Sequence, residues 1–100
     1  MAAVTWTPLA EAELEDILYF IGVECRRPMT AERIGLEIRE AVENHLRIGC
    51  PIRRHPDLPT HWSYLKHKRW LIAFEQVAGG IVVRRIVDAS RDLPEQFKDA

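Results

Sequence analysis

Residues 69–88 of the chain read RWLIAFEQVAGGIVVRRIVD, and this stretch decides the fold. Its apolar and β-branched residues predict two strands, Arg69–Val77 and Ile81–Asp88. Gly79 and Gly80 lie between the two strands. Because glycine tolerates the backbone angles of a tight turn, we expect these two residues to form the loop of a β-hairpin.

Both faces of this predicted hairpin are apolar. With the two glycines as the loop, Glu75 lies opposite Arg84, and Ala73 lies opposite Ile86. One face then carries Trp70, Ile72, Phe74, Val83 and Val87, and the other carries Leu71, Ala73, Val77, Val82 and Ile86. A hairpin needs only one covered face, and the two helices predicted from the preceding residues can cover only one of these two. We therefore expect a second polypeptide to cover the face that the rest of the chain leaves bare.

The residues before the hairpin predict two amphipathic helices and a short strand. The first helix begins with Thr7 as its N-cap and ends at Gly22. The second helix runs from Thr30 to the residues before 49–51 and shows apolar side chains at helical spacing. Two such helices joined by a short connection form an antiparallel hairpin. The short strand is expected at His61–Lys66.

Length and composition predict one domain, residues 1–100, with 47% apolar and 29% charged residues. No uncharged run approaches the roughly 18 residues that span a bilayer. The longest is Met1–Ala10, which also lacks the positive charge of an export signal. We therefore expect a cytoplasmic protein without membrane contact, in which Cys25 and Cys50 are reduced thiols.

Charge is distributed unevenly along the sequence. Residues 1–50 hold five Arg and nine Asp or Glu, a balance of −4, whereas residues 51–100 hold nine basic and six acidic residues, a balance of +3. The basic half predicts a polyanion or an acidic protein as partner. Alternatively, the acidic helices offset these charges within the chain.

No catalytic or metal-binding motif of high specificity is present. The sequence contains no phosphate-binding glycine loop, CxxC, HExxH or GxSxG pattern. His55, His61 and His67 are six residues apart, a spacing that matches no common zinc site, so we expect no metal and no cofactor. The acidic second helix argues against a helix-turn-helix reader, because a recognition helix must meet phosphates. We expect no sequence-specific DNA binding.

The remaining chemistry lies in a basic cluster on the predicted strands. Its members are Lys66, His67, Lys68, Arg69, Arg84, Arg85 and Arg91. Such a cluster can hold a phosphodiester, with Trp62, Tyr64 and Trp70 stacking on bases. It can equally pair with the acidic helices of its own chain while the aromatics fill the core, or receive carboxylates from an acidic partner.

Taken in order, several short motifs resemble the RelE/ParE superfamily of bacterial toxins, and the ParE branch most closely. They are WTPLA at 6–10, AERI at 31–34, PDLP at 56–59, RWLIAF at 69–74 and VRRIVDASRDL at 83–93. The resemblance implies an α+β fold, in which an N-terminal antiparallel αα-hairpin packs on a small, mainly antiparallel β-sheet. It also implies a small antitoxin, encoded beside this gene, that wraps the toxin. An antitoxin would supply the cover that the second hairpin face requires.

The resemblance leaves two activities open. ParE-like members inhibit DNA gyrase by protein binding, whereas RelE-like members are ribosome-dependent mRNA endonucleases. This sequence has Phe97 where nucleases often carry a tyrosine near the C-terminus, and Asp88 where many relatives carry a histidine. Both departures favour the gyrase inhibitor. A third hypothesis is a non-toxic module that only binds its antitoxin.

Site residues follow from this resemblance. Antitoxin contacts are predicted at Leu71, Ala73, Val82, Arg84, Arg85, Ile86 and Arg91, and target contacts at Lys66, Lys68, Arg69 and Trp70. On the nuclease alternative, Arg84, Arg85 and Arg91 are the catalytic residues.

Overall fold

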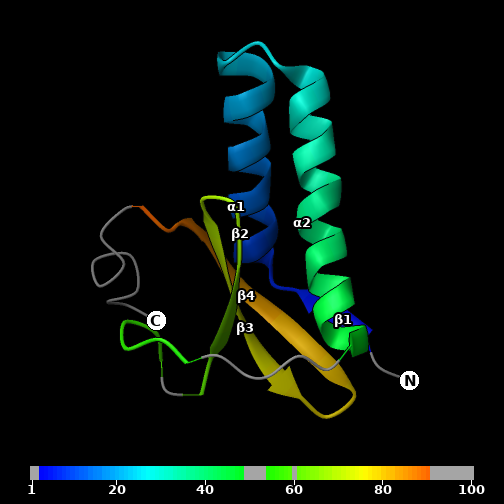
Figure 1. Cartoon of the computed structure of the whole chain (residues 1–100), viewed down its shortest axis with the longest axis vertical. Helices are drawn as coiled ribbons and strands as arrows, with labels where there is room; N and C mark the ends of the chain where they lie inside the picture. The colour runs from blue at the N-terminus through cyan, green and yellow to red at the C-terminus, as the bar shows by residue number, and fades with distance from the viewer. Residues whose placement is uncertain (1–2, 49–53, 60, 91–100) are drawn as a thin grey trace.

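The computed structural model of the chain describes residues 3–48, 54–59 and 61–90. In chain order its elements are β1 (Ala3–Trp6), α1 (Pro8–Tyr19), the π-helix η1 (Phe20–Glu24), α2 (Pro28–Ile48), β2 (Ser63–His67), β3 (Trp70–Val77) and β4 (Gly80–Asp88). Two long helices stand side by side and extend well beyond the sheet (Figure 1).

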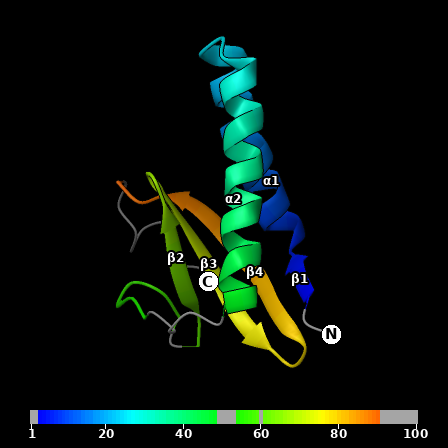
Figure 2. The same cartoon turned by 45° about the vertical axis from the view of Figure 1, so that its right-hand side comes forward.

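The four strands form one mixed sheet in the order β1-β4-β3-β2. β3 is antiparallel to both β2 and β4, whereas β1 is parallel to β4. Figure 2 shows α1 and α2 on one side of this sheet. The predicted α+β fold, an αα-hairpin packed on a small and mainly antiparallel sheet, is confirmed.

The first helix begins as predicted, but the helical segment does not stop at Gly22. The Thr7 hydroxyl accepts a hydrogen bond of 3.1 Å from the Ala10 amide, so Thr7 is the N-cap. The prediction that Gly22 stops the helix is wrong, because the chain continues as η1 through Glu24. A Cβ on Gly22 would lie only 3.2 Å from the Cβ of Ala31 in α2. This glycine therefore allows two helices to approach closely instead of ending one of them.

Strand β1 was not predicted from the sequence. Its four residues pair in parallel with the start of β4, from Ala3 opposite Gly80 to Trp6 opposite Val83. The pairing ends where the Thr7 amide donates to the Val83 carbonyl at 3.1 Å. Four residues are too few for a clear alternation of apolar and polar side chains, which is why the pattern gives little signal.

The hairpin register differs from the prediction in two ways. The two loop residues are Ala78 and Gly79, since Val77 pairs with Gly80. A β-bulge between Ala73 and Phe74 then shifts the register along the rest of the hairpin. A bulge places two residues opposite one and reverses the facing of the positions beyond it.

As a result of the bulge, Ile86 and Val87 exchange faces relative to the prediction. Ile86 belongs to the core beneath the helices. Its other buried members are Ala10, Leu14, Ile34, Ile38, Val42, Trp70, Ile72, Phe74, Ile81 and Val83. Val87 lies on the opposite face of the sheet, in a smaller core. The hydrophobic set that each face receives therefore depends on this one irregularity.

The smaller core is closed by the chain itself. Leu71, Ala73 and Val87 are buried there together with Leu58, and Trp62 packs against them. Figure 2 shows the segment that carries Leu58 on the side of the sheet away from the helices. The expectation that a second polypeptide must cover this face is therefore wrong, because residues before β2 return across it.

Gly80 and Gly79 allow a matched test of this architecture. A Cβ on Gly80 would lie 1.8 Å from the Ala3 carbonyl oxygen, whereas a Cβ on Gly79 meets nothing within 4 Å. We expect Gly80→Ala to lower the free energy of unfolding by more than about 2 kcal/mol, because the β1–β4 pairing must move apart. Gly79→Ala should cost only about 1 kcal/mol for its positive φ. Urea unfolding measures both, and equal losses would contradict the β1–β4 register.

Candidate protein-binding groove

A groove of about 730 Å³ lies between the helical hairpin and the adjoining ends of β3 and β4. The helical side contributes Glu13, Asp16, Ile17, Phe20, Ile21, Cys25, Arg27, Thr30 and Ile34, and the strands contribute Arg69, Trp70, Ile86, Val87 and Asp88. Its volume is in the range of sites that take up a ligand or the side chains of a peptide.

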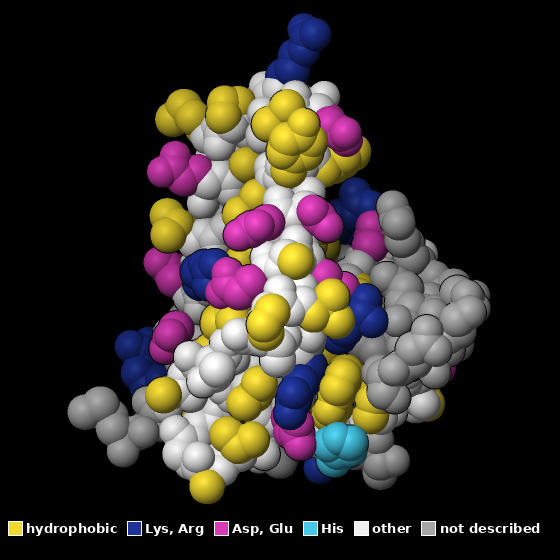
Figure 3. All heavy atoms as spheres, turned by 180° about the vertical axis from the view of Figure 1, so that it is seen from behind, with side chains coloured by type: hydrophobic (Ala, Val, Ile, Leu, Met, Phe, Trp, Pro, Cys, Tyr) yellow, Lys and Arg dark blue, Asp and Glu magenta, His cyan; other side chains and the backbone are white. Residues whose placement is uncertain are grey.

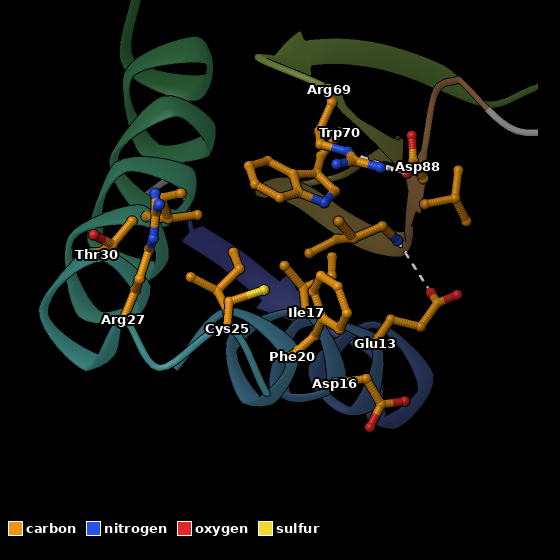
Figure 4. A pocket seen from close by; sticks show the side chains of 14 residues that line it. Glu13, Asp16, Ile17, Phe20, Cys25, Arg27, Thr30, Arg69, Trp70 and Asp88 are labelled. Atoms are coloured by element: carbon orange, nitrogen blue, oxygen red, sulfur yellow. Dashed lines mark hydrogen bonds and ion pairs between the residues drawn. The ribbon is translucent and has the colours of Figure 1, made fainter. Parts of the chain in front are cut away.

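The apolar surface of the groove comes from both layers of the fold. Trp70, at the start of β3, is buried and belongs to the helix-side core. Ile17 is half-buried, and Phe20 is 53% exposed. Figure 4 shows the Trp70 ring facing the helices across the groove, with Ile17 and Phe20 on the opposite side. An amphipathic peptide can bury apolar side chains against such a surface.

Arg69 and Asp88 form a charged border beside Trp70. Arg69 donates from Nε to Oδ2 of Asp88 at 3.1 Å, and its Nη2 contacts the same oxygen. Asp88 Oδ1 accepts hydrogen bonds from the amide and the hydroxyl of Ser90 at 2.9 and 2.6 Å. The Arg69 guanidinium, followed by the Ser90 hydroxyl, holds the pKa of Asp88 well below its usual range. This carboxylate is therefore charged at neutral pH.

Glu13 joins α1 to β4 at the other border of the groove. Its carboxylate accepts two hydrogen bonds from Arg85 Nε, at 3.1 and 3.0 Å, and one of 2.6 Å from Arg85 Nη2. It also accepts the Ile86 amide at 3.0 Å. β1 pairs with β4 only as far as Val83, so this part of the β4 edge lies beyond its neighbour. The side chain of Glu13 therefore bonds an amide of β4 that β1 does not reach.

The structure brings only some of the predicted antitoxin contacts to this groove. Leu71 and Ala73 are buried in the smaller core and lie outside the groove. Ile86 lines the groove but is almost fully buried. Val82 is half-buried in the part of β4 that pairs with β1, and it does not line the groove. Arg91 lies outside the described residues.

The two described arginines of the nuclease alternative bind different carboxylates. Arg84 donates to Glu75 in β3, with Nη2 to Oε1 at 2.6 Å, whereas Arg85 binds Glu13 in α1. Each guanidinium is thus held by a carboxylate of this chain, and in this conformation both pairs would have to open before the two arginines could hold a phosphate. The charge pattern thus matches the prediction that the acidic helix offsets part of the basic cluster.

Two of the predicted target contacts line the groove and two do not. Arg69 and Trp70 lie in it, whereas Lys66 and Lys68 lie on and after β2. Lys68 Nζ is 3.1 Å from Glu37 Oε1, and His67 Nε2 is 3.0 Å from the same oxygen. Hydrogen bonds from His67 first, and then from Lys68, hold the pKa of Glu37 below its usual value.

Sequence reasoning missed the helical side of the groove. Phe20, Cys25 and Arg27 were not predicted as site residues, because the helices were assigned only the role of covering the sheet. The signal available was the position of Phe20 outside the apolar stripe of its helix. A single exposed aromatic residue is ordinary on a protein surface, so this signal alone does not identify the groove.

Within the described ranges, no group of three or more potential metal-ligating side chains is found, and none of the helices is long and apolar enough to cross a bilayer. What the groove offers is an apolar surface bordered by fixed charges. Such a surface can bind a polypeptide segment.

The interactions of Glu13 should contribute more to the free energy of unfolding than the ion pair of Glu11, which lies on the same helix. Glu13→Ala removes an ion-pair partner of the half-buried Arg85 and the acceptor of the Ile86 amide, so we expect a loss of about 2 kcal/mol in unfolding free energy. Glu11 pairs with Arg39 at 3.2 Å in an exposed position, and Glu11→Ala should cost less than about 1 kcal/mol. Denaturant unfolding compares the two variants, and a Glu11 loss equal to the Glu13 loss would contradict this assignment.

Comparison with known proteins identifies the family and agrees with the fold. The family model described as "ParE toxin of type II toxin-antitoxin system, parDE" matches residues 4–93. A solved structure described as "Chromosomal ParDE TA system from P. aeruginosa" shares the fold with a TM-score of 0.70 at 20% identity. The match covers 88% of this chain and 96% of that one. No match was found among curated proteins. Because the family model spans most of the sequence, the chain belongs to the ParE toxin family of type II toxin–antitoxin systems.

Proposed function

We propose that the chain inhibits growth by binding DNA gyrase, and that a ParD-like antitoxin neutralises it by laying an apolar segment into the groove. On this proposal the chain acts in the cytoplasm, where gyrase acts on DNA. It works as a binding protein and needs no cofactor. The observation that carries the proposal is the open groove beside Trp70, with apolar residues on both sides and charges on its borders.

The chemistry of the groove supports a peptide as the neutralising ligand. Ile17 and Phe20 from the helical side and Trp70 from the sheet can receive apolar side chains spaced along one face of an antitoxin helix. Arg27 and Asp16 also line the groove, and neither makes an ion pair among the described residues. They are available for opposite charges on the antitoxin, which would fix its direction and register.

The arginine positions favour protein binding over RNA cleavage. A nuclease that stabilises a phosphorane-like transition state needs cations converging on one point. Arg84 and Arg85 are instead held by Glu75 and Glu13. The RelE-like alternative therefore requires both pairs to break before catalysis, and the gyrase proposal requires no such rearrangement.

Growth and supercoiling assays test the proposed target. Induction of the chain alone should arrest growth, and co-expression of the antitoxin encoded beside it should restore growth. The purified chain should inhibit supercoiling by gyrase in vitro. Arrest with unaltered gyrase and with cut mRNA would replace gyrase inhibition with the RelE-like alternative. Antitoxin binding with no effect on growth would support the non-toxic module.

Phe20 and Tyr19 provide a matched test of the groove. Both are exposed aromatic residues, at 53% and 59%, but only Phe20 lines the groove. We expect Phe20→Ala to weaken antitoxin binding by roughly tenfold to a hundredfold through lost apolar contact. Tyr19→Ala should leave the affinity within about threefold. Calorimetric titration with the antitoxin measures both, and equal weakening by the two variants would contradict the groove as the antitoxin site.

A further inference from the structure

The end of the helical hairpin is a second surface with the composition of a binding site. We define the hairpin tip as Tyr19, Val23, Arg26 and Met29. These residues lie at the end of α1, in η1, in the connection and at the start of α2. This end of the hairpin projects far from the sheet (Figure 1). Seen from behind, hydrophobic side chains gather at this end and a basic side chain projects from its apex (Figure 3).

The apolar residues of the tip are exposed without supporting the fold. Tyr19, Val23 and Met29 are 59%, 57% and 82% exposed, and none of them packs in either core of the chain. A single exposed apolar residue is ordinary on a protein surface. Three large ones at the end of one protruding hairpin indicate a surface that another molecule covers.

Arg26 shows that the charge at the tip is unused within the chain. Its φ is +56°, a left-handed conformation in which glycine or asparagine is less strained than arginine. It follows η1, a π-helix, which is an irregularity frequent at functional sites. Among the described residues the Arg26 side chain makes no ion pair or hydrogen bond. The chain therefore presents a cation here that contributes no internal contact.

We propose that the hairpin tip is the contact surface for the cellular target, a protein whose facing site is apolar and bordered by carboxylates. Arg26 and the adjacent Arg27 outnumber Glu24 in this segment, and none of the three makes an ion pair among the described residues, so charge complementarity selects a border with more carboxylates than cations. The three apolar residues supply the buried centre of the interface. This inference rests on the proposed function, since it assigns the surface through which the toxin acts. It moves the target contact away from Lys68 and Arg69, which are held by Glu37 and Asp88.

The tip adjoins the groove, which explains how a ligand in the groove can block it. Phe20, Cys25 and Arg27 line the groove and are sequence neighbours of the tip residues Tyr19 and Arg26. An antitoxin segment seated in the groove would lie beside the tip and obstruct the approach of a large target. The target and the antitoxin then contact different residues, although the two cannot be bound at the same time.

The test separates toxicity from antitoxin binding in the full-length chain. The tip variant combines Tyr19→Ser, Val23→Ser and Met29→Ser, and a second variant, Arg26→Glu, reverses the charge. The matched control combines Leu9→Ser and Leu36→Ser, which change residues of similar exposure, 52% and 59%, away from the tip. Each variant is induced alone for colony counts and titrated with the antitoxin. Retained antitoxin binding also shows that a variant is folded.

We expect the tip variant and Arg26→Glu to restore colony counts by roughly a hundredfold or more, because the first removes the apolar centre of the interface and the second places a carboxylate against its acidic border. Antitoxin affinity should stay within about threefold of the wild type. The control should remain toxic. If the tip variants are as toxic as the wild type, the inference is overturned and the proposed function stands. If the tip variants lose toxicity and antitoxin binding together, the inference is overturned as well. A tip that changes only self-association of this chain would overturn it too. A harmless wild type would overturn the proposed function and this inference with it.

Discussion

The β-bulge opposite Ala73 and Phe74 is the constraint on which the other features depend. Because it reverses the facing of β4 beyond Val83, Ile86 enters the core under the helices while Val87 enters the smaller core. One inserted residue thus determines the packing of both faces of the sheet.

The Glu13 carboxylate lies at one border of the groove in which we propose that the antitoxin binds. It joins α1 to Arg85 and to the Ile86 amide of β4. Apolar side chains line the opening, and the charges on its borders are partly paired, as Arg69 and Asp88 show. The groove can therefore remain open in the free chain. It still provides apolar surface that a partner can bury and charges that can orient the bound segment. The hairpin tip lies next to this opening.

Much of the fold could be predicted from the sequence because its signals are local. The Thr7 cap, the helical periodicity and the two strands around the glycines each depend on a few neighbouring residues. The bulge and the parallel strand β1 could not be predicted, since both depend on pairing between distant segments. The cover provided by Leu58 was missed for the same reason. The groove combines residues from both ends of the chain, so only Arg69, Trp70 and Ile86 among the predicted site residues lie in it.

The central claim is that a partner segment binds between the helical hairpin and the end of the sheet, and not on the face that the chain covers itself. Hydrogen exchange of the free chain and of its complex with the antitoxin tests this most directly. Slower exchange at residues 17–20 and 86–88, with unchanged exchange at 54–59, is the result that we expect. Slower exchange at 54–59 with an unchanged groove would contradict the claim.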